Sequence, residues 1–182
     1  MSTKARATFD DLARAPGKAE LINGEVVLMS PTGEGPATAG GEIYFSLRKY
    51  VEATGIGRAY PDNAAFKVDL PHRQSFSPDA AYYTGPRAGM DFCPAPPVFA
   101  AEVRSKGDYG PRAEQEMQQK RADYFAAGTL VVWDVDLLDE AVVRKYLPAS
   151  AATPAAVFRR GETADAEPAV PGWRMPVDHL FR

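Results

Sequence analysis

The chain has 182 residues, of which 45% are hydrophobic and 25% are charged, and its formal net charge is −3. These values are ordinary for a soluble globular protein, and the length predicts one domain over residues 1–182. The slight negative charge excludes a protein coated with basic residues for nonspecific nucleic-acid binding, although it is compatible with a local basic groove.

Cysteine and histidine are scarce. Cys93 is the single cysteine, so an intramolecular disulfide is excluded, and His72 and His179 are too few for a zinc site of the usual His/Cys type. The sequence contains no run of ~18 apolar residues, so we expect no membrane span. The N-terminus lacks the apolar core of a secretory signal. We therefore expect a cytoplasmic protein.

The N-terminal third begins with a short helix and a hairpin. Thr8 is a suitable N-cap for the helix. Residues 19–22 and 25–29 read as two strands joined by Asn23-Gly24, the strongest signal for a two-residue turn because both positions tolerate positive φ. The sequence therefore predicts an N-terminal β-hairpin.

Helices and strands alternate through the rest of the chain. Helices are predicted at 37–53 and 112–127, ended by Gly55 and Gly128 respectively. The predicted strands and strand pairs are 58–60, 64–68, 77–83, 97–105, 130–136, 142–146 and an edge hairpin near 157–161. This order favours one mixed α/β (α+β) domain.

Two of the predicted strands each carry one acid, Asp79 in residues 77–83 and Glu102 in residues 97–105. A carboxylate within an apolar strand is costly to bury unless it is compensated. Two such acids on neighbouring strands repel each other unless a cation lies between them. Because side chains alternate along a strand, Glu102 faces the same side as Arg104. If Asp79 faces Glu102, the two carboxylates can share one ion.

This arrangement predicts a magnesium (or manganese) site. The backbone carbonyl of Val103 would add a third oxygen ligand to Asp79 and Glu102. Magnesium keeps several of its waters, so two protein carboxylates are enough. The alternative for each acid alone is that Asp79 is a turn residue after Pro78 and that Glu102 is a surface acid at a strand end.

A lysine lies in the apolar stripe of the second long helix. At 100° per residue, one narrow face carries Ala113, Met117, Lys120, Tyr124 and Ala127. A lysine there needs a partner. If the stripe packs on the sheet, Lys120 approaches the two acids and can position water or offset charge on a phosphate. The alternative is a snorkelling lysine paired with Glu116.

Two interpretations are also open for Glu20 and for a set of basic residues. Glu20, just before the hairpin turn, is either an additional ligand or an ordinary hairpin residue. A set of basic residues near the presumed site either guides a polyanion or is ordinary solvated surface charge; it consists of Arg104, Lys106, Arg112 and Arg121.

Several segments, in this order and spacing, resemble the Uma-two family of proposed restriction endonucleases, a branch of the PD-(D/E)XK nuclease superfamily. They are Glu20-Leu-Ile-Asn-Gly-Glu-Val-Val, Pro78-Asp79, Glu102-Val-Arg-Ser-Lys-Gly-Asp, Lys120-x-x-x-Tyr124-x-x-x-Gly128, Trp133-Asp134-Val135 and the tail from Pro171-Gly172-Trp173 to Asp178-His179-Leu180-Phe181. The resemblance covers nearly the whole chain. It implies a restriction-endonuclease-like core, in which a mixed central β-sheet is flanked by helices, with a divalent-metal nuclease site.

The resemblance also implies roles for single residues. Asp79 and Glu102 fall on the acids of the family, and Glu20 falls on its early acid. The superfamily lysine two residues after the Glu is Arg104 here, and the resemblance implies that Lys120 on the helix replaces it. Family members often carry a histidine at the start of the first long helix, where this chain has Pro36-Ala37-Thr38-Ala39.

The leading hypothesis is a magnesium-dependent DNA endonuclease. Asp79 and Glu102 bind the metal, Lys120 orients water and Glu20 assists; a homodimer would allow both strands to be cut. The rival hypothesis is a non-catalytic binding or assembly protein that keeps the nuclease fold, since fold does not guarantee chemistry. A third is a metal-dependent hydrolase of small phosphate esters.

Overall fold

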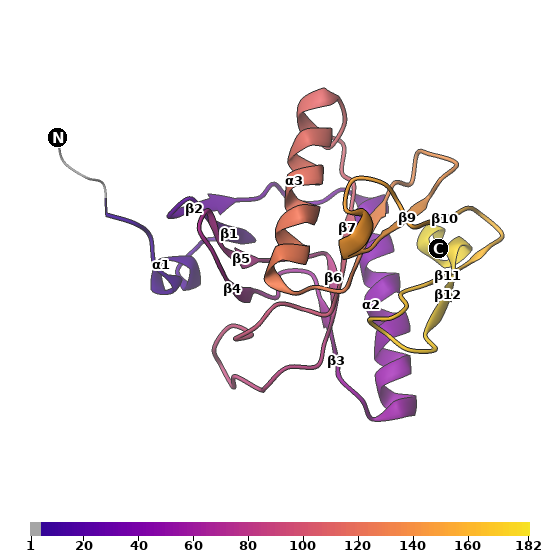
Figure 1. The fold of residues 1–182 in the computed structure, drawn as a ribbon, viewed down its shortest axis with the longest axis horizontal. Helices are drawn as coiled ribbons and strands as arrows, with labels where there is room; N and C mark the ends of the chain where they lie inside the picture. The colour runs from indigo at the N-terminus through magenta and orange to yellow at the C-terminus, as the bar shows by residue number, and fades with distance from the viewer. Residues whose placement is uncertain (1–4) are drawn as a thin grey trace.

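The computed structural model describes residues 5–182 and contains two main β-sheets (Figure 1). The six-stranded sheet has, in spatial order, β10 (Ala156–Phe158), β9 (Val143–Tyr146), β8 (Val131–Val135), β7 (Phe99–Val103), β6 (Ala80–Tyr83) and β3 (Arg58–Pro61). The four-stranded sheet has β2 (Glu25–Leu28), β1 (Ala19–Ile22), β5 (Arg73–Phe76) and β4 (Phe66–Leu70). In the larger sheet β7 and β8 are parallel and the other pairs are antiparallel, which confirms a mixed central sheet.

Two long helices, α2 (Glu34–Thr54) and α3 (Pro111–Ala127), cover opposite faces of the six-stranded sheet. The alternation of β7 sets these faces. Phe99, Ala101 and Val103 pack with α2 in the largest apolar cluster of the protein. Ala100 faces the other side and packs with Tyr124 of α3. The β7 residues next to Val103 therefore point toward α3.

The α3 helix is the crossover between the parallel strands β7 and β8. Parallel neighbours cannot be joined by a tight turn, so the chain leaves β7, crosses the sheet as α3 and returns as β8. Gly128 ends the helix at φ 112°, a left-handed conformation that favours glycine. This crossover holds the α3 side chains over the end of β7.

The predicted N-terminal elements are confirmed. Helix α1 (Phe9–Ala13) begins with a complete capping box, in which Thr8 and Asp11 each accept a backbone hydrogen bond. Asn23 and Gly24 have φ of 53° and 75°, as the hairpin turn between β1 and β2 requires. Figure 1 shows α1 and this hairpin at one end of the molecule and the C-terminal segments at the other.

The remaining elements lie at the C-terminal end. They are η1 (Pro148–Ser150), η2 (Val177–Phe181) and a two-stranded sheet of β11 (Thr163–Asp165) and β12 (Arg174–Pro176). Within residues 5–182, the helices are all too short or too polar to cross a bilayer.

Three expectations about these elements were wrong. Helix α2 begins at Glu34, three residues before the predicted start, because a proline fits the first turn of a helix. Strand β5 was not predicted, since three of the four residues of Arg73–Phe76 are polar, yet the strand is largely buried. No hairpin forms at 157–161, because β10 pairs with β9 whereas β11 pairs with β12.

Candidate active site

The two strand acids face each other across neighbouring strands. In the β6–β7 register Ala80 lies opposite Ala101, so the next pair places Asp79 opposite Glu102. The carboxylate of Asp79 accepts a hydrogen bond of 2.7 Å from the Val103 backbone N–H. Because the N–H and C=O of a strand residue point the same way, the Val103 carbonyl also lies on the Asp79 side. The structure thus brings the carboxylates of Asp79 and Glu102 onto one face of neighbouring strands, with the Val103 backbone beside Asp79.

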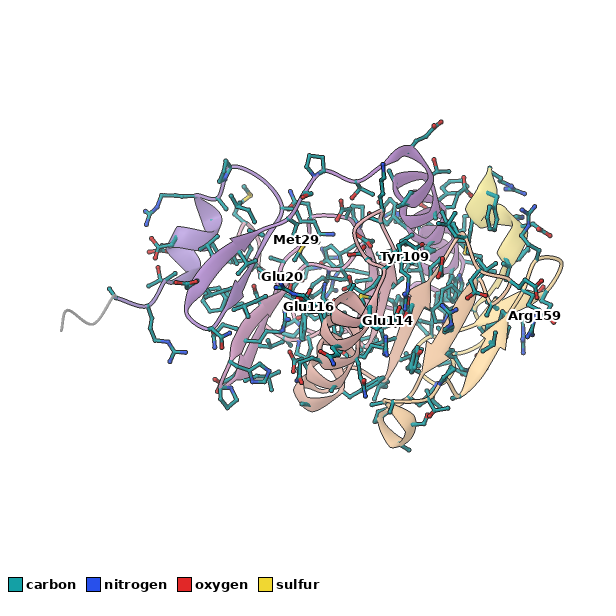
Figure 2. All side chains as sticks on the ribbon, turned by 90° about the horizontal axis from the view of Figure 1, so that it is seen from above. Glu20, Met29, Tyr109, Glu114, Glu116 and Arg159 are labelled. Atoms are coloured by element: carbon teal, nitrogen blue, oxygen red, sulfur yellow. The ribbon has the colours of Figure 1, made fainter. Side chains whose placement is uncertain are left out.

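Lys120 projects from α3 between two acids. Its Nζ atom lies 2.9 Å from Glu102 Oε2 and 3.1 Å from Glu20 Oε1. Glu116, the alternative partner on the same helix, instead accepts from Arg112 at 2.8 Å, so the interpretation of Lys120 as a snorkelling surface lysine was wrong. Figure 2 shows Glu20 next to the α3 helix, which carries Glu114 and Glu116.

Glu102 is a buried carboxylate with raised proton affinity. Its second oxygen accepts from the Tyr124 hydroxyl at 2.5 Å. Burial, and then the nearby carboxylates of Asp79 and Glu20, raise the pKa of Glu102 although Lys120 opposes the shift. Lys120 itself is buried, which favours its neutral form, yet the carboxylates of Glu102 and Glu20 raise its pKa. Lys120 therefore stays protonated at neutral pH, and it lies beside the Glu102 carboxylate, whose ionised form is disfavoured by burial.

Glu20 is not an exposed hairpin residue, because its side chain is 1% exposed. It accepts hydrogen bonds from Arg73 and, at 2.9 Å, from the Ser77 backbone N–H. Burial alone would raise the pKa of Glu20, but Lys120 and Arg73 together hold it below its usual value. Glu20 therefore stays ionised and anchors Lys120.

Lys18 is a site residue that sequence reasoning missed. Its Nζ atom lies 2.6 Å from Asp79 Oδ1 and 2.6 Å from Asp62 Oδ1. Burial acts against the charge of Lys18, but the carboxylates of Asp79 and Glu102 raise its pKa. The available signal was its position two residues before Glu20, which places both side chains on one face of an extended segment.

Two members of the predicted basic set are structural, so their assignment to a polyanion-binding surface was wrong. Arg104 is buried and donates to both oxygens of Asp134, at 2.7 and 2.8 Å, and also to Glu114. Arg121 donates to the same Asp134 at 3.1 Å. The register explains this, because Asp134 on β8 is the direct partner of Glu102 on β7. Lys106 and Arg112 remain exposed.

The model of the family described as "Uma2: Putative restriction endonuclease" matches residues 6–178. The chain belongs to the Uma2 family. No curated protein matches it. A similar fold is found in a crystal structure from Anabaena variabilis ATCC 29413, described as a "putative nuclease belonging to DUF820"; the TM-score is 0.72 at 18% identity, with 96% of this chain and 97% of that chain covered. The restriction-endonuclease-like fold predicted from the sequence is confirmed.

In this Uma2 chain the start of α2 lies beside the candidate site. Ala37, in the segment where the resemblance implies a histidine in many members, lines a cavity of about 30 Å³ together with Gly40, Asp62 and Asp79.

The donor set of this Uma2 site suits a hard cation that keeps part of its water shell. Among residues 5–182, no cluster of three or more His, Cys, Asp or Glu side chains is arranged to hold a metal. The donors available to an ion at the candidate site are therefore two carboxylates, of Asp79 and Glu102, and the backbone carbonyl of Val103. All are oxygen donors, as magnesium and manganese prefer, and magnesium does not need an all-protein cage.

A second polar cluster, centred on Asp123, contacts the site through Arg73. Asp123 accepts from Arg73 at 2.9 Å and from Gln119 at 2.8 Å, and it lies 2.8 Å from the His72 ring. Burial would raise the pKa of Asp123, but Gln119, His72 and Arg73 together lower it. Since Arg73 also binds Glu20, this cluster fixes the position of Glu20.

The lowered pKa of Asp123 predicts a pH-dependent contribution to stability. A carboxylate with a folded-state pKa below its unfolded value stabilises the fold above the unfolded value, and loses this effect as the pH falls through the folded value. Asp123→Asn should therefore cost about 1–3 kcal/mol at pH 7, and the difference from wild type should shrink below about pH 4. Urea unfolding between pH 7 and 3 measures both quantities.

The matched control is Asp69→Asn, which changes an exposed acid on β4. Its free energy of unfolding should stay close to that of wild type throughout. A cost for Asp123→Asn that is the same at pH 7 and pH 3 would contradict a role of the ionised carboxylate.

Proposed function

We propose that this Uma2 protein is a magnesium-dependent DNA endonuclease. The family assignment supports a nuclease, and the observation that carries the finer proposal is the position of Lys120 between Glu20 and Glu102, next to Asp79. Asp79, Glu102 and the Val103 carbonyl would hold the ion. A bound divalent ion supplies a Lewis acid and lowers the pKa of water.

Lys120 is the residue proposed to act on the substrate. Because its pKa is raised, it is not a general base at neutral pH. Its ammonium group can donate hydrogen bonds to an attacking water, and it can stabilise negative charge that develops on the phosphate oxygens. Glu20 holds this ammonium group in place, and the Tyr124 hydroxyl fixes the second oxygen of Glu102.

We also propose duplex DNA as the substrate and a homodimer as the active form. One centre cuts one strand, so two subunits are needed to cut both strands at one place. The family description as a restriction endonuclease supports DNA over other phosphodiesters.

The second candidate is a nucleic-acid-binding protein without turnover. The specific observation in its favour is that each site acid already has a cation from the chain itself. Lys18 pairs with Asp79, Lys120 pairs with Glu102, and Glu20 is shared by Lys120 and Arg73. A site balanced in this way needs no ion to keep its acids together.

Metal removal tests the proposal directly. The purified protein should nick supercoiled plasmid with Mg²⁺ or Mn²⁺ and should lose this activity when EDTA is added, because the ion supplies the Lewis acid. Ca²⁺ at the same concentration should support DNA binding, measured by fluorescence anisotropy, with little cleavage. DNA binding without cleavage under any of these metals would favour the second candidate.

A substrate screen under the same conditions separates the remaining alternative. Single-stranded DNA, duplex DNA, RNA and nucleotides are incubated at equal phosphate concentration. We expect duplex DNA to be cut. Hydrolysis confined to nucleotides would instead indicate an enzyme that acts on small phosphate esters.

A further inference from the structure

A lysine ammonium group lies between two carboxylates at the edge of the candidate site. Lys18 Nζ is 2.6 Å from Oδ1 of Asp79 and 2.6 Å from Oδ1 of Asp62, and the Lys18 side chain is 15% exposed. The three residues come from separate elements, since Lys18 precedes β1, Asp62 follows β3 and Asp79 precedes β6. An ion pair built from three elements is part of the folded framework.

The two oxygens of Asp79 have different partners. Oδ2 accepts from the Val103 N–H at 2.7 Å, and Oδ1 accepts from Lys18. A carboxylate offers about four lone-pair positions, so Asp79 keeps capacity for a metal ion while both partners fix its orientation. Lys18 therefore holds one oxygen of the Asp79 carboxylate, while the Val103 N–H holds the other.

The space beside this ion pair can admit a small ion. The cavity of about 30 Å³ is lined by both Asp62 and Asp79, together with Thr32 and glycines of α2. A cavity of this size holds a water-sized occupant. Asp62 and Asp79 both border this cavity, and the Lys18 ammonium group joins their carboxylates.

We propose that Lys18 is a positioning residue that occupies the place of a second metal ion, so that the centre binds a single divalent cation. The inference rests on the proposed metal centre of Asp79 and Glu102. Two-metal nuclease sites use a second cation beside the first. Here the ammonium group supplies that charge, and like charges disfavour a second divalent ion close to it.

Calorimetric titration of the full chain with Mn²⁺ tests this proposal through stoichiometry. Wild type should bind one ion. Lys18→Met keeps the apolar stem but removes the charge, and it should bind two. Lys18→Arg keeps the charge and should return the stoichiometry to one. Lys49→Met, which removes an exposed lysine from α2, is the matched control and should also bind one ion.

The outcomes separate this inference from the proposed function. Two ions bound by wild type, or one ion bound by both wild type and Lys18→Met, would overturn the role of Lys18 and leave the metal centre standing. No ion bound by wild type but one by Lys18→Met would support the role of Lys18 and contradict the metal centre. No binding by either protein would overturn both.

Discussion

Glu102→Gln should lower the rate of DNA cleavage about 10³-fold, because a catalytic metal ion contributes several kcal/mol and ~1.4 kcal/mol corresponds to a factor of ten. The same change should leave the free energy of unfolding equal to that of wild type or higher. Burial and neighbouring carboxylates raise the pKa of Glu102, so its ionised form opposes folding at neutral pH. The amide removes this charge and still accepts from Tyr124, while Lys120 keeps Glu20 as its partner.

Single-turnover plasmid cleavage and thermal unfolding of the same preparations measure the two effects. Asp79→Asn should reduce cleavage to a similar extent, since it removes the other carboxylate. Glu116→Gln is the control, because Glu116 is an acid on the exposed side of α3 that pairs with Arg112. Cleavage that persists at the wild-type rate in both Glu102→Gln and Asp79→Asn would remove these residues from the proposed centre.

Asp134→Asn, unlike Glu102→Gln, should lower the free energy of unfolding. The expected loss is about 3–5 kcal/mol, the cost of breaking a buried ion pair. Asp134 is fully buried and neutralises two guanidinium groups, those of Arg104 and Arg121. The asparagine leaves Arg121 without its carboxylate and leaves Arg104 with the half-exposed Glu114. Urea unfolding at pH 7 measures the loss.

Asp134 and Glu102 are direct neighbours in the β7–β8 register, so the stability effects of the two substitutions can be compared directly. The same acid-to-amide change is made on adjacent strands, at two buried positions of one face. Equal stability losses in Asp134→Asn and Glu102→Gln would show that both acids are structural. A loss confined to Asp134→Asn would assign the structural role to the acid paired with arginine.

The sequence predicted the elements whose local signals agree with their packing. Asn23-Gly24 specifies a two-residue hairpin turn in any context, and Gly128 ends α3 where its left-handed conformation is needed. The spacing of Lys120 and Tyr124 on one helix face predicted that both point into the sheet, and both contact Glu102. These features depend on residues close together in the chain.

Partners that are distant in the chain could not be predicted. Alternation correctly placed Arg104 on the face of Glu102, but only the strand register shows that Asp134 lies there to bind it. Strand β5 was missed because the burial of Arg73 depends on Glu20 and Asp123, each at least 50 residues away. Hydrophobic periodicity identifies apolar strands, whereas the buried Arg73 and Ser75 of β5 are held by polar contacts.

The candidate site lies between the two sheets, which pack on each other through the buried side chains of Phe66 and Phe76. Glu20 and the neighbouring Lys18 belong to the N-terminal hairpin, whereas Asp79 and Glu102 belong to the six-stranded sheet. The hairpin meets its own sheet through one register pair, Ile22 with Arg73. Undocking of the hairpin would separate Glu20 from Lys120 and Lys18 from Asp79, so the geometry of the proposed centre depends on how this short segment packs against the rest of the fold.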